Sequence, residues 1–255
     1  MTMVALNRRT FYTGSMAEPY ALLSRFYDED WGDFSLNYAE MLDRLLRERG
    51  IKRARIVDLG CGTGVLASAL ASLGHTVTGI DRSPSMIDVA RSRTKGQPRV
   101  SFVIGDMTEL AGASDGYDAA VCSFDAVNYL RRLPLLKKFF KHVATMLLPA
   151  GLFLFDSNTE TLYKSQNGDL TPHRFGDITI LEESQYDARS RTAATLFSFP
   201  DGTCEVHYQR PWEDKELMPR LEAAGFDVLH RYSWFDSLPF YSKAPKIFYV
   251  AEKRN

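Results

Sequence analysis

The sequence has almost no net charge and few cysteines. Its 31 basic and 32 acidic side chains leave a formal charge of −1, which gives no general electrostatic attraction to nucleic acid or to an anionic membrane. The three cysteines, Cys61, Cys122 and Cys204, are too widely spaced for a disulfide framework or a zinc site. We therefore expect no metal, no nucleic-acid partner and a reducing compartment.

Long apolar runs are also missing. No stretch of about 18 or more apolar residues occurs, which argues against a membrane-spanning helix. Arg8 and Arg9 near the start are not followed by the apolar segment of a secretory signal. The sequence therefore favours a cytoplasmic protein without a membrane partner.

What the sequence does contain is a regular alternation of strands and helices. Short apolar segments predict strands, and the segments between them carry apolar residues at helical spacing. The predicted strands are 54–60, 75–81, 100–106, 117–125 and 151–157, and the predicted helices are 64–73, 83–94 and 133–147. This alternation is typical of an α/β protein with a doubly wound, Rossmann-like parallel sheet.

The alternation of strands and helices ends after Asn158. Residues 176–186, 193–199 and 204–209 read as strands, and the sequence Phe-Pro-Asp-Gly at 199–202 predicts a hairpin turn. We interpret this region as an antiparallel β insertion and name residues 159–212 the flap. A helix at 213–225 and two strands at 226–235 and 246–252 then complete a single domain.

The most informative segment is the glycine-rich loop at 56–64 (IVDLGCGTG). Gly60, Gly62 and Gly64 stand between a strand and a helix, where the backbone can turn tightly and approach a ligand. Asp81 closes the next strand, and a carboxylate there can accept the two hydroxyl protons of a ribose. These features predict a ribose-containing ligand at the carboxyl end of the sheet.

The loop is not that of a dinucleotide-binding protein. Its spacing is G-x-G-x-G, and Val65 stands where the third glycine of G-x-G-x-x-G would be expected. Asp58 places a negative charge beside the loop, which would repel a pyrophosphate but suit an ammonium group. A ligand with a ribose, an ammonium and a short carboxylate is S-adenosylmethionine.

Segments 57–64, 79–81, 83–86 and 105–107, in this order, resemble the class I S-adenosylmethionine-dependent methyltransferases. The resemblance implies a seven-stranded sheet of order 3-2-1-4-5-7-6 with an antiparallel last strand. It also implies that the glycine loop surrounds the methionine end, that Asp81 holds the ribose, and that Asp106 and Met107 meet the adenine. Residues 51–158 and 213–255 would then form the cofactor-binding core, and residues 1–50 an N-terminal tail and lid helices.

The cofactor residues predicted in this way come from the loop, from the ends of four strands and from the lid. They are Tyr27, Tyr38, Asp58, Gly60, Cys61, Gly62, Thr63, Gly64, Asp81, Arg82, Met86, Gly105, Asp106, Met107, Ser123 and Phe124. For Met86, packing of its helix into the core is an equal alternative. Cys61 is interpreted as a small loop residue rather than a reactive thiol.

The acceptor is expected to be a small molecule. The segment 123–130 lacks the Asn/Asp-Pro-Pro-Tyr/Phe motif of methyltransferases that act on bases. Residues 23–28, Tyr38 and 155–158 resemble bacterial small-molecule enzymes such as amino-sugar N-methyltransferases, which implies that Tyr27 and Tyr38 close the site. Aromatic residues of the flap suit an apolar or sugar-like acceptor, or else fill the flap's own core or the interface of a homodimer.

Three residues are candidates for catalysis. Asp125 and Asp156 end the fourth and fifth strands, where they either orient an acceptor amine or cap the following turn. His207 is a candidate base, although a single histidine in a strand is more often packed or exposed. We expect N-methylation, with O-methylation second, by in-line transfer. The alternatives are a non-catalytic module that binds the cofactor and an enzyme that modifies tRNA or protein.

Overall fold

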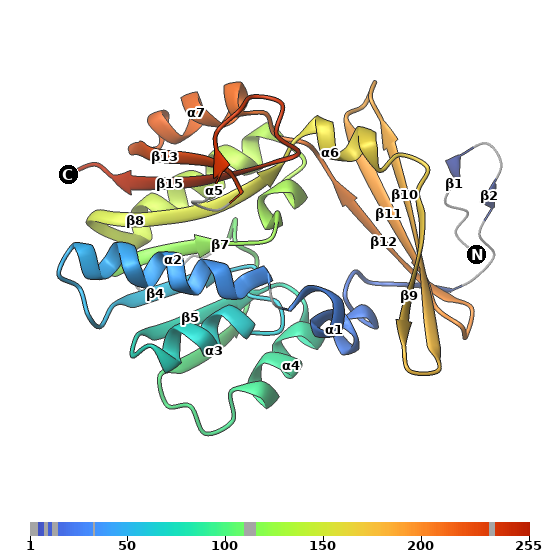
Figure 1. Ribbon diagram of the computed structural model, residues 1–255, viewed down its shortest axis with the longest axis horizontal. Helices are drawn as coiled ribbons and strands as arrows, with labels where there is room; N and C mark the ends of the chain where they lie inside the picture. The colour runs from blue at the N-terminus through green and yellow to red at the C-terminus, as the bar shows by residue number, and fades with distance from the viewer. Residues whose placement is uncertain (1–4, 8–9, 12–14, 33, 110–115, 235–237) are drawn as a thin grey trace.

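The computed structural model describes the chain in two principal sheets joined by helices (Figure 1). The residues it describes are 5–7, 10–11, 15–32, 34–109, 116–234 and 238–255. At the N-terminal side, β1 (Ala5–Asn7) and β2 (Thr10–Phe11) form a separate two-stranded pair. Among the described residues, no helix is both long and apolar enough to cross a membrane.

The larger sheet confirms the predicted α/β class. Its eight strands follow the order β14-β13-β15-β8-β7-β4-β5-β6. β4, β5, β6, β7 and β8 are parallel, whereas β15 pairs antiparallel with both β8 and β13. The bounds are β4 Arg55–Leu59, β5 Thr76–Asp81, β6 Val100–Ile104, β7 Tyr117–Cys122, β8 Leu147–Asn158, β13 Phe226–Trp234, β14 Leu238–Pro239 and β15 Lys246–Lys253. The predicted count of seven strands is therefore wrong by one, because β14 adds a two-residue edge strand.

Helices cover both faces of this sheet. α2 (Phe34–Glu48) and α3 (Val65–Ser72) bury their apolar sides against one face, and α5 (Leu133–Met146) and α7 (Asp214–Ala223) against the other. α4 (Pro84–Arg93) packs on β5 and β6. It begins as the sequence predicts, since the Ser83 hydroxyl accepts the backbone N–H of Met86 at 3.3 Å and Pro84 occupies the first turn.

The flap contains more strands than the three predicted. Its sheet has the order β3-β12-β11-β10-β9, with β9 Leu170–Phe175, β10 Ile178–Asp187, β11 Thr192–Ser198 and β12 Thr203–Gln209. The fifth strand, β3 (Ser15–Ala17), comes from the N-terminal region and pairs parallel with β12. The short helix α6 (Glu160–Ser165) connects β8 to β9. The flap sheet is thus completed by a strand distant in sequence.

A short segment at residues 20–31 bridges the two sheets, and we call it the lid segment. It contains the 3-10 turn η1 (Leu23–Arg25) and helix α1 (Tyr27–Trp31). Figure 1 shows α1 between the larger sheet and the flap. A second 3-10 turn, η2 (Ala126–Tyr129), follows β7 at the same edge. The lid segment, η2 and the flap therefore meet beside the carboxyl ends of the parallel strands.

Candidate active site

The glycine loop adopts the conformation that its sequence requires. Gly60, Gly62 and Gly64 all have left-handed φ angles, of 74°, 53° and 75°. A Cβ at Gly64 would lie 2.9 Å from the Cβ of Ala90 and the ring of Phe102, so this glycine permits α3 to pack closely on its neighbours. A Cβ at Gly62 would meet nothing within 4 Å, so the loop is open on that side.

Asp81 stands beside the loop at the end of β5. Its two carboxylate oxygens accept the backbone N–H groups of Gly62 at 2.9 Å and Ser83 at 2.8 Å. Burial raises the pKa of Asp81, and those N–H groups oppose the shift. Each oxygen has further lone pairs, so the carboxylate can still accept hydroxyl protons from a ribose.

Asp58 is a buried carboxylate without a partner. Its side chain is fully buried, and neither oxygen has a hydrogen-bond partner among the described residues. Burial, together with the charge of Asp81, raises the pKa of Asp58 to about 7. An unpaired buried acid beside an open glycine loop suits a ligand that carries an ammonium group. The residues present therefore fit S-adenosylmethionine.

The other predicted cofactor residues differ in how deeply they are buried. Asp106 and Arg82 are exposed at the same edge, and the Asp106 carboxylate accepts the backbone N–H of Thr108 at 2.7 Å. Gly105 donates its backbone N–H to the backbone carbonyl oxygen of Asp81 at 2.9 Å, and Met107 packs against the core. Cys61, Thr63, Met86 and Ser123 are buried. For Met86 the position in α4 agrees with the packing alternative.

The two predicted lid tyrosines lie in different places. The Tyr27 ring lines a cavity and meets Phe124 edge-on, with centroids 6.0 Å apart. Tyr38 is instead buried in the core, and its hydroxyl donates to Asp156 Oδ1 at 2.5 Å. Tyr38 is absent from the residues that line the described cavity. Because α2 packs across the face of the sheet and not over its edge, Tyr38 contacts Asp156 from the core and does not reach the cavity.

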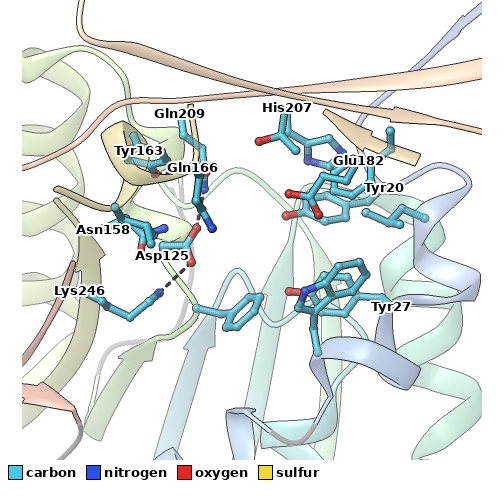
Figure 2. Close-up of a pocket in the computed structure, with 16 residues that line it drawn as sticks. Tyr20, Tyr27, Asp125, Asn158, Tyr163, Gln166, Glu182, His207, Gln209 and Lys246 are labelled. Atoms are coloured by element: carbon cyan, nitrogen blue, oxygen red, sulfur yellow. Dashed lines mark hydrogen bonds and ion pairs between the residues drawn. The ribbon is translucent and has the colours of Figure 1, made fainter. Parts of the chain in front are cut away.

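The cavity has a volume of about 250 Å³ and lies between the flap, the lid segment and the ends of β7 and β8. Figure 2 shows Asp125, Lys246 and Gln209 on one side and Tyr20, Glu182 and His207 on the other. It is lined by Tyr20, Leu23, Tyr27, Trp31, Phe124, Asp125, Asn158, Leu162, Tyr163, Gln166, Glu182, Thr195, Phe197, His207, Gln209 and Lys246. Two of the three predicted catalytic residues, Asp125 and His207, thus share one cavity.

The third, Asp156, is fully buried and belongs to an ionic cluster behind Asp125. Lys246 Nζ lies 2.8 Å from Asp125 Oδ1 and 2.6 Å from Asp156 Oδ2, and Gln209 donates to Asp125 Oδ2 at 2.6 Å. Burial raises the pKa of Asp125 in spite of Lys246. Burial alone would lower the pKa of Lys246, but the two carboxylates raise it. Asp125 is therefore held in one orientation at the cavity wall.

The backbone around Asp125 is unusual. Phe124 and Asp125 have φ angles of 56° and 50°, which non-glycine residues seldom adopt, and the Asp125 N–H donates to Asp156 Oδ2 at 2.8 Å. This turn places the Phe124 ring and the Asp125 carboxylate at the cavity. Strained conformations of this kind are common at functional sites.

His207 lies in a second polar cluster. Its Nδ1 is 2.8 Å from the Tyr129 hydroxyl, and its Nε2 is 3.3 Å from Glu205 Oε2. The Tyr129 hydroxyl is 2.6 Å from that of Tyr20. Five residues of the two clusters were not predicted from the sequence: Tyr20, Tyr129, Glu205, Gln209 and Lys246. The position of Lys246 at the start of the last strand was the one local signal available.

Comparisons with known proteins agree with this geometry. Residues 56–151 match the family model described as a methyltransferase domain. The putative methyltransferase YqeM of Bacillus subtilis (strain 168) is 28% identical over 232 residues, covering 85% of this chain and 89% of that protein. The glycine loop, Asp81 and this match identify the chain as a class I S-adenosylmethionine-dependent methyltransferase. The predicted class is confirmed, and S-adenosylmethionine is the cofactor of that class.

Solved structures show that the fold extends over the whole chain. A S-adenosylmethionine-dependent methyltransferase from Clostridium acetobutylicum ATCC 824 superposes with a TM-score of 0.79 at 21% identity, covering 92% of this chain and 99% of that one. The sugar N-methyltransferase KedS8 from Streptoalloteichus sp. ATCC 53650 has a TM-score of 0.71 at 19% identity and covers both chains completely. At such identities, the likeness establishes the fold.

Proposed function

We propose that this enzyme methylates a nitrogen atom of a small, cationic acceptor bound in the cavity. The observation that carries the proposal is the lining of that cavity, in which the Glu182 carboxylate and the Asp125 carboxylate, the latter paired with Lys246, face a space walled by aromatic rings. The volume of about 250 Å³ is suited to a small molecule. S-adenosylmethionine supplies the activated methyl group when it is bound.

The lining favours an amine over other acceptors. Tyr27, Trp31, Phe124 and Phe197 contribute aromatic rings, which attract cations through their faces. Carboxylates add direct electrostatic attraction for an ammonium group. A neutral alcohol would gain little from either feature. An amine also attacks through its own lone pair once one proton has left, whereas an alcohol needs a strong base at the moment of transfer.

The protein's own residues position the acceptor and exclude water. Asp125, fixed by Lys246 and Gln209, can accept an N–H of the acceptor and direct its lone pair along the line of transfer. The lid segment covers the cavity with Tyr20, Leu23, Tyr27 and Trp31. Exclusion of water strengthens these polar contacts and prevents loss of the methyl group to solvent. The structurally similar KedS8 is a sugar N-methyltransferase, which supports the choice of nitrogen.

The proposal is tested with pure protein and methyl-labelled S-adenosylmethionine. A panel of small primary and secondary amines, amino sugars among them, is paired with alcohols and phenols of the same carbon skeleton. We expect label in N-methyl products and none in the matched alcohols. Label found only in hydroxyl compounds would instead establish O-methylation. If calorimetry showed no binding of the cofactor at all, the methyltransferase activity itself would be excluded.

A further inference from the structure

Glu205 is the most completely bonded acid of the flap. It lies on β12 with no exposed surface and accepts the backbone N–H groups of Tyr20 at 2.8 Å, Leu22, and Leu23 at 3.1 Å. Burial alone would raise the pKa of Glu205, but hydrogen bonds from His207 and from Leu22 and Leu23 lower it below its usual value. Glu205 is therefore a carboxylate, which can only accept hydrogen bonds.

That single fact orients a chain of hydrogen bonds. Since Glu205 accepts, the Nε2 of His207 must carry a proton and donate it, which leaves the Nδ1 of a neutral ring as an acceptor. The Tyr129 hydroxyl must then donate to that Nδ1, at 2.8 Å. Its oxygen is left to accept from the Tyr20 hydroxyl, 2.6 Å away.

The chain ends at the cavity. The Tyr20 ring lines the cavity, and its oxygen keeps lone pairs after its proton has been given to Tyr129. The Tyr20 backbone is fixed at φ 67°, an unusual value for a tyrosine, and its N–H is held by the same Glu205. Glu205 thus controls both the position of Tyr20 and the direction of the hydrogen bond that Tyr20 offers.

We propose that Glu205, through His207 and Tyr129, makes the Tyr20 oxygen a proton acceptor for the methyl acceptor. The inference rests on the proposed function and adds a requirement for the methyl acceptor. The acceptor must present an N–H group to the Tyr20 oxygen in the cavity. Tyr20 is the catalytic residue, because it faces the acceptor. Glu205, His207 and Tyr129 are positioning residues for it and a path for its proton.

The proton transfer balances along this path. The bond from sulfur to methyl breaks as the bond from nitrogen to methyl forms, and the electron pair of the broken bond stays on sulfur as a thioether. Before this transfer, the ammonium nitrogen of the acceptor gives one proton to Tyr20, which frees the lone pair that attacks the methyl group. Tyr20 passes its own proton to Tyr129, and Tyr129 passes its own to His207 Nδ1. The resulting imidazolium is held by the Glu205 carboxylate, and the proton returns to water through Tyr20 once the product has left.

Protonation of His207 in advance would reverse the chain. Both ring nitrogens would then donate, and Tyr20 would present a proton to the cavity instead of accepting one. The groups facing His207 are Glu205 from β12, Tyr129 from η2, Tyr20 from the lid segment and Phe197 from β11. Of the charged groups that line the cavity, Glu182 lies on the same side as His207, and Asp125 and Lys246 lie on the opposite side.

Nitrogen-15 spectra of the histidine rings test the direction without any methyl acceptor. With the His207 signals assigned from the His207→Gln variant, wild-type protein at pH 8 should show the tautomer protonated at Nε2. In Glu205→Gln the amide donates to Nε2, so His207 should change to the tautomer protonated at Nδ1. A wild-type ring protonated at Nδ1, or a folded Glu205→Gln variant without the change, would overturn the proposal.

Kinetics provide the second test, with variants that retain the shape of the cavity. Tyr20→Phe and Tyr129→Phe should each lower kcat on the order of 10²-fold with little change in KM, because each removes one hydroxyl of the proton path and leaves the binding surface intact. Tyr208→Phe is the matched control on β12, since Tyr208 does not line the described cavity. A normal kcat in both variants would refute the proton path.

The two tests separate this inference from the proposed function. If the wild type transfers no methyl group to any amine, the proposed function fails, while the spectra still decide the direction of the chain. If the wild type methylates amines but the spectra show the tautomer protonated at Nδ1, the proposed function is supported and the proposed role of Glu205 is refuted.

Discussion

Thr63 of the glycine loop donates its hydroxyl proton to Asp28 of the lid segment, with Oγ1 and Oδ1 2.5 Å apart. Arg93 on α4 binds the other carboxylate oxygen of Asp28 and also donates to the carbonyl oxygen of Thr63 at 3.0 Å. The carboxylate of Asp28 therefore joins the lid segment to the loop and to α4. Any movement that opens the lid segment must break these bonds, so the lid and the cofactor loop are mechanically coupled.

Asp28→Ala should weaken cofactor binding. The substitution removes the only acceptor that joins Thr63 and Arg93 to the lid segment among the described residues, and the freed segment covers the site less often. Since charged hydrogen bonds that are partly exposed contribute about 1 kcal/mol, the dissociation constant should rise roughly five- to tenfold. Calorimetric titration measures it. Asp88→Ala, an exposed acid on α4, is the control and should bind normally.

Asp58 predicts a pH dependence of cofactor binding. Its folded-state pKa of about 7 lies above the usual 3.8, so the neutral form is favoured by folding and the stability contributed by this group is lost as pH rises from about 4 towards 7. A bound ammonium group requires the ionised form. Cofactor affinity should therefore increase between pH 6 and pH 8.

The matched variant is Asp58→Asn, whose side chain has the same shape but cannot ionise. Its affinity for the cofactor should be lower and should not change across this pH range. Without ligand, it should also avoid the loss of stability that the wild type shows near neutral pH, an effect of at most about 4 kcal/mol. Equal pH dependence in both proteins would mean that Asp58 does not meet the ammonium group.

The cofactor loop was predictable from the sequence because its parts are local. Strand, glycine turn, helix start and the acid at the end of the next strand are neighbours in sequence, and backbone geometry alone requires residues of these types. Ser83 and Pro84 similarly determine where α4 begins. A pattern read along the chain contains all the information needed for such features.

The acceptor side could not be predicted in the same way. Glu205 accepts backbone N–H groups of the lid segment, and Lys246 pairs with acids at the ends of β7 and β8. These partners are distant in sequence, so no local sequence pattern predicts either contact. β9 escaped detection since Pro172 and polar neighbours weaken its strand pattern. Such residues are tolerated because β9 is an edge strand of the flap sheet.

Lys246→Met should destabilise the protein. The variant leaves Asp125 and Asp156 close together in a buried cluster without their cation. Because removal of one partner of a buried ion pair typically costs about 3–5 kcal/mol, the free energy of unfolding should fall by about 3 kcal/mol or more. Burial raises the pKa of Asp125, so protonation of that carboxylate should relieve the repulsion and shrink the deficit as the pH is lowered from 7 to 5. Denaturant unfolding measures it, and Lys243→Met, at an exposed position, is the control. A loss below 1 kcal/mol would show that the cluster tolerates two uncompensated acids.

Glu182→Gln tests how the cavity recognises a positive charge. Glu182 lines the cavity, and its Oε2 lies 2.8 Å from His173 Nε2, so the variant preserves shape and removes one negative charge. KM for a cationic amine should rise about tenfold with kcat nearly unchanged, since the carboxylate attracts the acceptor equally before and during transfer. Glu183→Gln, at the next position of β10 and outside the cavity lining, should leave KM unaltered. If both variants raised KM alike, the attraction would come from the general charge of the flap. If neither did, the acceptor would approach the cavity as a neutral molecule.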